Sequence, residues 1–280
     1  MYPSNFYSFS FSNEKWTRLN DLPSLRRYNG SVKMKDSLYI VGGAYSKSIN
    51  RFNLNTRTFS TVNWLDEYRN DFGVCQYDED NFIFAGGLEE SYKVTNTCFL
   101  YNVTTSSFKQ VGSLNIKRYG HVLIKSEDGE IFALGGNNQT KELNLIEKFN
   151  KKLQTWTKIK TKLKIGRFQP QAVAYKNFIF IIGGKQRNGE MTDSIEKFDT
   201  KTGKIETIQA KLKAPRCNFA IAKHGNLAYI LGGEVFFKSV KLLKTYCPSC
   251  LVEIFNLELE TVEEGKNLPF EDSCFTAHVV

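Results

Sequence analysis

Five arginines recur along the sequence, each 15–17 residues ahead of a pair of glycines. A guanidinium group is planar and donates two parallel hydrogen bonds, which suits it to recognising a carboxylate. An aromatic residue directly follows three of these arginines and could line the same surface. The candidate ligand-binding residues are Arg27, Arg69, Arg118, Arg167 and Arg216, with Tyr28, Tyr119 and Phe168.

The histidines offer little catalytic chemistry. The chain has three, His121, His224 and His278, and no two of them have the spacing of metal ligands. A catalytic triad or a metal centre needs several convergent side chains. His224 falls in a predicted turn, whereas His121 and His278 fall on predicted inner strands, where packing is the favoured interpretation. We therefore predict no catalytic residue, no metal site and no cofactor.

The cysteines include one C-x-x-C pair, Cys247 and Cys250. Zinc usually needs a second such pair, and a redox role is more typical of a thioredoxin-like context. Two ordinary thiols are the favoured interpretation, with a disulfide or redox role and a metal role left open. Cys75, Cys217 and Cys274 fall on predicted inner strands and are interpreted as small buried hydrophobic residues.

Glycine pairs divide the chain into repeats. They occur at intervals of 44–49 residues, and each ends a short apolar run that follows a polar turn. Continuous apolar runs of this length are typical of strands buried on both faces. The pairs begin at Gly42, Gly86, Gly135, Gly183 and Gly232, and the runs cover residues 38–41, 82–85, 131–134, 178–182 and 227–231.

A second pattern follows each glycine pair. An aromatic residue precedes Asn or Asp, and another bulky apolar residue lies seven positions beyond it. Two strands joined by a tight turn would place these residues opposite each other. The pairs are Phe52 and Phe59, Tyr101 and Phe108, Phe149 and Trp156, Phe198 and Ile205, Phe255 and Val262, and an N-terminal copy, Phe9 and Trp16.

The three patterns together give four strands per repeat. One such sheet cannot bury both faces alone, so the copies must pack on one another. Radial closure is the all-β arrangement that leaves only short, protected edges. The 22 Phe and 13 Tyr residues also favour β structure. The sequence therefore predicts an all-β propeller.

The repeats resemble those of the Kelch family, whose hallmarks are the glycine pair, a following Tyr or Phe, and a Trp about seven residues later. The tryptophan is kept at Trp156 and Trp16 only. The resemblance implies one Kelch-type propeller domain over residues 1–280, with five full repeats. It also implies an incomplete sixth blade shared by the two termini, from residues 6–19 and 268–280.

The sixth copy has no glycine-pair strand, so we expect a fragment or one end of a larger protein, with a five-bladed ring as the alternative.

By symmetry, the arginines should ring one face near the channel. In Kelch adaptors, arginines at this position help to bind acidic peptides. The alternative is that they only join adjacent blades through salt bridges or backbone carbonyls. Asp272 takes the equivalent place in the sixth copy.

Charge and targeting signals narrow the function classes. The net charge is +9, but the basic residues are scattered, and no motif for nucleic-acid binding is present. No apolar run is long enough to span a membrane, and the N-terminus does not resemble a signal peptide. We expect a cytoplasmic protein with no nucleic-acid or membrane partner.

We predict a protein-binding module that holds a partner peptide, expected to be acidic, on the arginine-bearing face. Loops on a rigid scaffold are the usual place for binding. A ubiquitin-ligase adaptor or scaffold role follows from family analogy alone. The alternative is a Kelch-like enzyme acting on a carbohydrate or other small molecule in the channel. A deep pocket with a perturbed acid or histidine would favour that alternative.

Overall fold

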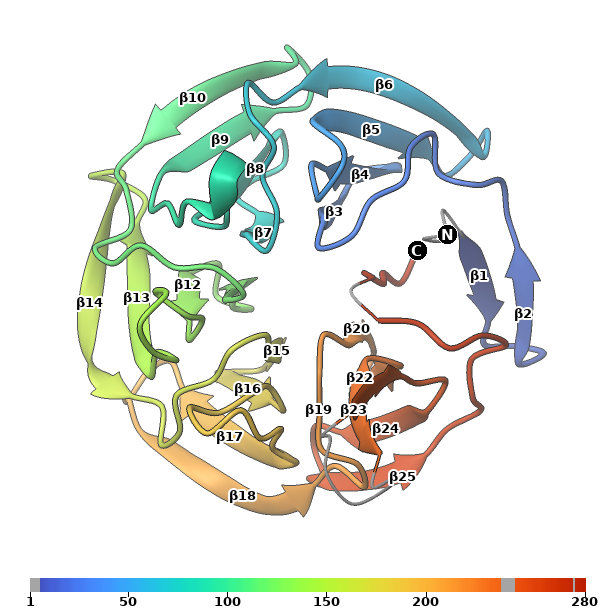
Figure 1. Cartoon of the computed structure of the whole chain (residues 1–280), viewed down its shortest axis with the longest axis vertical. Coiled ribbons are helices and arrows are strands. Elements are labelled where there is room, and N and C mark those ends of the chain that lie inside the picture. The colour runs from blue at the N-terminus through green and yellow to red at the C-terminus, as the bar shows by residue number, and fades with distance from the viewer. Residues whose placement is uncertain (1–5, 238–244, 274) are drawn as a thin grey trace.

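The computed structural model describes residues 6–237, 245–273 and 275–280. Antiparallel sheets are arranged around a central axis, with the strands of each sheet following one another from the axis to the rim (Figure 1). Five of the sheets in the described chain have four strands, and we call them blades 1 to 5 in chain order. The predicted all-β propeller is confirmed.

The blades use the predicted repeats. Blade 1 has β3 (Gly30–Met34), β4 (Ser37–Val41), β5 (Ser48–Asn53) and β6 (Thr58–Trp64). Blade 2 has β7 (Gly73–Gln76), β8 (Asn81–Ala85), β9 (Cys98–Asn102) and β10 (Ser107–Val111). Blade 3 has β11 (Val122–Lys125), β12 (Ile131–Leu134), β13 (Leu145–Asn150) and β14 (Thr155–Lys162). Blade 4 has β15 (Gln171–Tyr175), β16 (Phe178–Ile182), β17 (Ser194–Asp199) and β18 (Ile205–Lys211). Blade 5 has β20 (Ala220–His224), β21 (Leu227–Leu231), β24 (Val252–Asn256) and β25 (Thr261–Glu264).

The strand register follows the predicted aromatic pairs. Phe52 lies opposite Phe59 and Phe149 lies opposite Trp156, and the other four pairs are cross-strand partners in the same way. Their rings pack in the layers between blades, where the buried clusters lie. The core is therefore a series of inter-blade layers.

Each glycine pair lies at the end of a second strand, in the left-handed backbone region. Gly86 and Gly87 have φ of 65° and 98°, and the other four pairs are alike. A Cβ on Gly86 would lie 2.5 Å from the carbonyl oxygen of Arg118. The pair is needed because the next blade's entry loop passes directly over it.

The first and last described segments of the chain lie near each other between blades 5 and 1 (Figure 1). β1 (Tyr7–Ser10) and β2 (Lys15–Arg18) form a two-stranded sheet, with Phe6 and Leu19 packed against blade 1 and Trp16 against blade 5. The predicted inner strand near the C-terminus is corrected, since residues 275–280 form no assigned strand and Cys274 lies outside the described residues. A strand there would need a second strand of its own blade to pair with.

Blade 5 carries an additional small sheet. It consists of β19 (Arg216–Cys217), β22 (Glu234–Phe237) and β23 (Thr245–Pro248). Cys217 therefore lies in this sheet, just before the inner strand on which it was predicted. We call the face that carries this small sheet the upper face. The loops between second and third strands, and the loops that enter each inner strand, also lie on it. The turns on the opposite, lower face are short.

Candidate functional site

Four of the five predicted arginines are buried. Arg118, Arg167 and Arg216 are 0% exposed and Arg69 is 7% exposed. Each donates to the carbonyl of the first glycine of its own blade's pair, as Arg167 Nη1 does to Gly183 O at 2.7 Å. The prediction that Arg118, Arg167 and Arg216 contact a ligand is therefore corrected, because these side chains are fully buried in the core. Arg69 bonds to its own blade in the same way, but it also lines a pocket of about 210 Å³.

A carboxylate completes each of these arginine sites. Arg167 Nη2 lies 2.8 Å from Glu196 Oε1, and both side chains are fully buried. Arg118 pairs in the same way with Glu147. Arg216 pairs with Glu253, and Arg69 with Glu89 from a loop. Burial lowers the pKa of each guanidinium, and the adjacent carboxylate opposes that shift.

The arginine main chain reaches the preceding blade. The carbonyl of Arg118 accepts a hydrogen bond from Gly87 N at 2.8 Å, and the same bond recurs at the next two blade boundaries. Asp272 O accepts the equivalent bond from Gly233 N, as its predicted place in the sixth copy requires. Each arginine thus joins adjacent blades, which is the alternative role considered for this position.

Arg27 is not the first member of this series. Arg26 is 5% exposed and donates to Gly42 O at 3.2 Å and to Asn50 Oδ1. Burial lowers its pKa to about 10, and an amide takes the place of the carboxylate found in blades 3 to 5. Arg27 is only partly buried and its guanidinium lies 5.4 Å from the Tyr28 ring centre. The spacing contained the signal, since 16 residues separate Arg26 from Gly42, whereas Arg27 gave the shortest of the five intervals.

Two positions beyond each buried arginine, one residue from each blade lies at the channel entrance. These residues all have φ between 51° and 57°. The N–H groups of the last four each donate to the carbonyl of the preceding member, at distances from 2.7 Å for Gly120 to 3.4 Å for Asn218. We call these residues the collar. It consists of Tyr28, Asp71, Gly120, Gln169 and Asn218.

A side-chain bridge spans part of the collar. Gln169 Nε2 donates to Asp71 Oδ1 at 3.1 Å, across the position of Gly120. A Cβ on Gly120 would lie 3.0 Å from Gln169 Cγ, so the missing side chain leaves room for this bridge. Removal from solvent raises the pKa of Asp71 to about 7, with the charge of Glu234 adding to the rise and the Gln169 bond opposing it.

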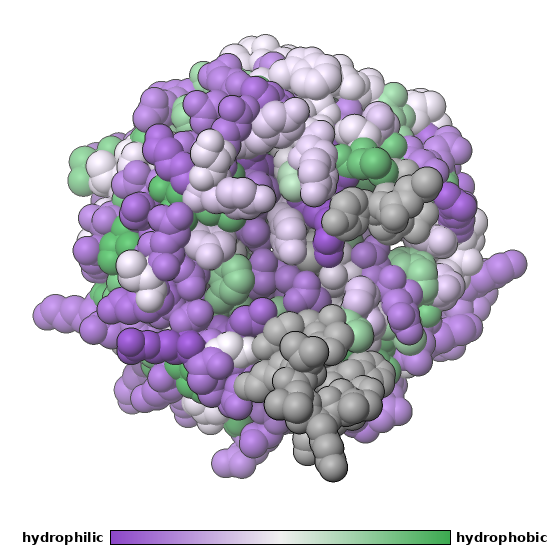
Figure 2. All heavy atoms as spheres, viewed as in Figure 1, coloured by the Kyte–Doolittle hydropathy of each residue, from purple (hydrophilic) through white to green (hydrophobic). Residues whose placement is uncertain are grey.

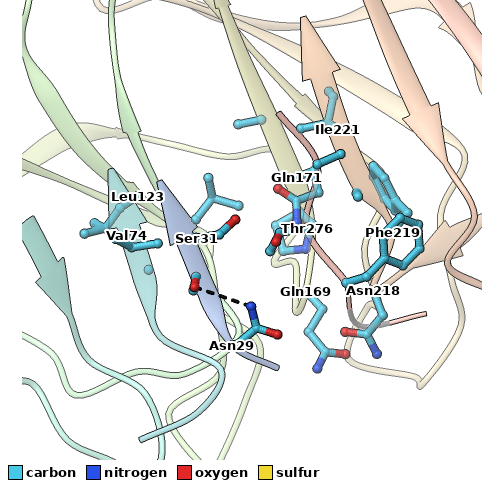
Figure 3. Close-up of a pocket in the computed structure, with 18 of the residues that line it drawn as sticks. Asn29, Ser31, Val74, Leu123, Gln169, Gln171, Asn218, Phe219, Ile221 and Thr276 are labelled. Carbon is cyan, nitrogen blue, oxygen red and sulfur yellow. Dashed lines mark hydrogen bonds between the residues drawn. The ribbon is translucent and has the colours of Figure 1, made fainter. Parts of the chain in front are cut away.

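The collar opens into a channel cavity of about 440 Å³. Ser31, Gln171 and Thr276 bring polar groups to its wall, and Val74 and Ile221 bring apolar ones (Figure 3). In the same view Gln169 and Asn218 lie together at one end of the channel. The cavity is therefore polar at its entrance and mixed along its wall.

The predicted aromatic residues separate into two positions. Tyr28 belongs to the collar and lines the cavity. Tyr119 and Phe168 lie one residue earlier and pack edge to face, with ring centres 5.0 Å apart. The sequence patterns do not reveal Asp71, Gln169 and Asn218, because the collar repeats a backbone conformation and not a residue type.

His121 fills an aromatic position. It occupies the place that Phe72 and Phe219 take in blades 2 and 5, and it is 5% exposed. Neither ring nitrogen has a hydrogen-bond partner in the described structure, and burial lowers its pKa well below the usual value. Ser31 Oγ lies 2.6 Å from His278 Nε2, and burial lowers the pKa of His278 to about 4.

No cluster in the described residues could hold a metal ion. Cys75, Cys98, Cys217, Cys247 and Cys250 are all free thiols. Burial raises the pKa of Cys75 and of Cys98 to about 12, so neither provides a reactive thiolate. Among the described residues, no helix is long and apolar enough to cross a membrane.

A family model described as the KLHDC2/KLHL20/DRC7 Kelch-repeats domain matches residues 71–261, more than half of the chain. The chain belongs to the Kelch-repeat family. This Kelch chain is similar to a solved structure titled "Structure of YjhT", with a TM-score of 0.81 at 14% identity, covering 93% of this chain and 89% of that one. At that identity the likeness shows the fold alone.

Curated relatives match shorter stretches. An F-box/kelch-repeat protein of Arabidopsis thaliana is 28% identical over 162 residues, which are 54% of this chain and 38% of that protein. Kelch repeat protein C2 of vaccinia virus is 28% identical over 191 residues, 65% of this chain and 36% of that protein. Kelch-like protein 41 of Mus musculus is 28% identical over 127 residues, 42% of this chain and 21% of that protein. The matched stretches span less than two fifths of these relatives.

Proposed function

We propose that this chain is a protein-binding module that holds a partner protein on its upper face. The observation that carries the proposal is a group of exposed tyrosines over blades 1 and 2. Tyr45, Tyr68 and Tyr92 are 64%, 40% and 79% exposed, and each lies on an upper-face loop. We call them the tyrosine rim.

Contacts between loops hold the tyrosine rim together. Lys47 Nζ lies 5.0 Å from the ring centre of Tyr68 and 3.2 Å from Glu90 Oε1, in the short helix η1 (Glu90–Tyr92). Tyrosine gives a large contact area with few rotatable bonds, and it is enriched at protein interfaces. Elsewhere the face seen in Figure 2 is mainly hydrophilic, with apolar side chains in small scattered groups.

The relatives suggest the form of this role. One relative is named as an F-box/kelch-repeat protein. This name suggests one form of the proposed role, in which the chain is an adaptor that presents a bound protein to a ubiquitin ligase. The domain that contacts the ligase would be supplied by another subunit or segment. We propose the cytoplasm as the compartment of this action, because the free thiols of the five described cysteines suit a reducing environment.

Capture from native cell lysate tests the proposal. We expect the proteins captured by the wild type to be lost by Tyr45→Ala/Tyr92→Ala. The matched control is Leu153→Ala/Leu259→Ala, which removes two exposed side chains from turns on the lower face. Equal capture by both double variants, at wild-type levels and with native circular dichroism, would refute the proposal.

A second candidate is an enzyme that acts on a carbohydrate or other small molecule in the channel. The cavity and the pKa of Asp71 near 7 favour it, because a carboxyl group titrating near neutral pH suits general acid–base catalysis. Incubation with a sugar panel and a metabolite extract, read by mass spectrometry, tests it. Turnover abolished by Asp71→Asn would support this candidate, turnover unchanged by that variant would rule out Asp71 as the catalytic acid or base, and no turnover of any compound would refute the enzyme.

A further inference from the structure

Each of the two side-chain amides of the collar donates one hydrogen bond to a carboxylate at the channel mouth. Gln169 donates to Asp71 at 3.1 Å, and Asn218 Nδ2 donates to Glu234 Oε1 at 3.0 Å. Within the described structure, Gln169 Oε1, Asn218 Oδ1 and Asp71 Oδ2 receive no other hydrogen bond. Besides one remaining N–H on each amide, these side chains therefore offer a ligand three oxygens that accept hydrogen bonds, one of them on a carboxyl group.

The backbone and the arginines of this region provide little to bind an anion. The N–H groups of Asp71, Gly120, Gln169 and Asn218 already donate along the collar. Four predicted arginines are buried in ion pairs. Arg27 lies close enough to Asp272 for its charge to oppose the burial-driven rise in the pKa of that carboxyl. An acidic peptide would meet few donors here.

The charge at the entrance contrasts with that of the whole chain. The protein carries a net charge of +9, yet two carboxyl groups, Asp71 in the collar and Glu234 bonded to Asn218, lie close enough for the charge of Glu234 to raise the pKa of Asp71. Farther along the channel from Gln169 and Asn218, Val74 and Ile221 provide apolar groups on opposite sides of the wall (Figure 3). A long side chain with an aliphatic stem and a cationic end matches this combination.

We propose that the collar binds a lysine or arginine side chain of the partner, with Asp71, Gln169 and Asn218 accepting hydrogen bonds from its charged end. This inference rests on the proposed binding function of the upper face and reverses the acidic-partner expectation. The tyrosine rim would contact neighbouring residues of the same partner.

Binding should depend on the ionisation of Asp71. Its carboxyl faces Gln169 of blade 4 and the carboxylate of Glu234, and its charge raises the pKa of Tyr119 in blade 3. Because the pKa of Asp71 is about 7, its ionised fraction grows about tenfold from pH 6 to pH 8. A cationic ligand should therefore bind up to about tenfold more tightly at the higher pH.

The probe is a blocked peptide, Gly-Ser-Gly-Arg-Gly-Ser-Gly, titrated into the full chain at pH 8. Binding is followed by the ¹⁵N NMR signals of the Gln169 and Asn218 side-chain amides. Control peptides carry citrulline or glutamate in place of arginine. Asp71→Asn should weaken binding of the arginine peptide by about fivefold or more, as expected for a lost charge-assisted hydrogen bond. Gln169→Met should also weaken it, while Asp66→Asn, at an exposed acid elsewhere on the upper face, should not.

The outcomes separate this inference from the proposed function. Saturable shifts with the arginine peptide that weaken in both collar variants support it. Equal binding of the glutamate or citrulline peptide, no shift at the collar, or unchanged affinity in Asp71→Asn would overturn it. Capture that is lost in Tyr45→Ala/Tyr92→Ala but kept in Asp71→Asn would reject the basic side chain while leaving the binding function intact.

Discussion

The buried arginines and the collar lie two residues apart in the same loops, yet they differ in what the repeat preserves. The arginine position keeps its residue type in all five blades, at Arg26, Arg69, Arg118, Arg167 and Arg216, and each side chain bonds to the chain's own glycine carbonyl. The collar keeps its backbone angles and varies its side chains from tyrosine to aspartate to glycine.

This difference shows where binding specificity can arise in a repeat protein. A residue type that every blade keeps, such as the buried arginine, makes a structural contact that every blade needs. A position whose backbone is fixed and whose side chain varies can place different groups around one opening. The collar therefore gives the channel mouth an asymmetry that the arginine positions lack.

The largest expected effect is at the arginine position. Arg167→Ala would leave the carboxylate of Glu196 buried without its cation and should reduce the free energy of unfolding by about 3–5 kcal/mol. Gln169→Ala, two residues later, should cost about 1 kcal/mol or less. Urea unfolding followed by circular dichroism measures both, and equal losses would remove the distinction between the two positions.

Arg26 and Arg27 test the corrected register. Arg26→Ala should cost about 2–3 kcal/mol, because carbonyls such as Gly42 O lose a buried donor. Arg27→Ala should change stability by about 0.5 kcal/mol, as is usual for a partly exposed side chain. Thermal unfolding of the two variants side by side decides the point, and a larger loss for Arg27→Ala would restore the original assignment.

Much of the fold was predictable because local patterns determine it. The apolar runs, the glycine pairs and aromatic partners such as Phe149 and Trp156 were placed correctly from their spacing. The site was harder, since guanidinium chemistry suits a ligand carboxylate and a buried Glu196 equally well. Only tertiary packing decides between them. The bridge from Gln169 to Asp71 joins residues 98 positions apart, and no local pattern indicates it.

His121→Phe should raise stability by about 1–2 kcal/mol at neutral pH, because it replaces two unpartnered nitrogens with the ring that other blades use. The pKa of His121 lies well below its usual value, so its neutral form is favoured in the folded state. That contribution is present above about pH 6.5 and is lost as the pH falls below it. Unfolding from pH 7 to pH 5 should show a weaker loss for the variant, and a steeper one would contradict this account.

The last prediction concerns Asp71 itself. Its folded pKa of about 7 lies above the ordinary carboxyl value, so the protonated form is favoured in the folded state. The stability from this group is fully present below about pH 4 and is lost as the pH rises to about 7. Asp71→Asn should remove this loss, seen as a wild-type-minus-variant difference that falls across that range. If the difference in unfolding free energy between wild type and variant does not change with pH, the carboxylate of Asp71 is well solvated. The contrast between the polar entrance and the buried arginine layer would then depend on side-chain type alone.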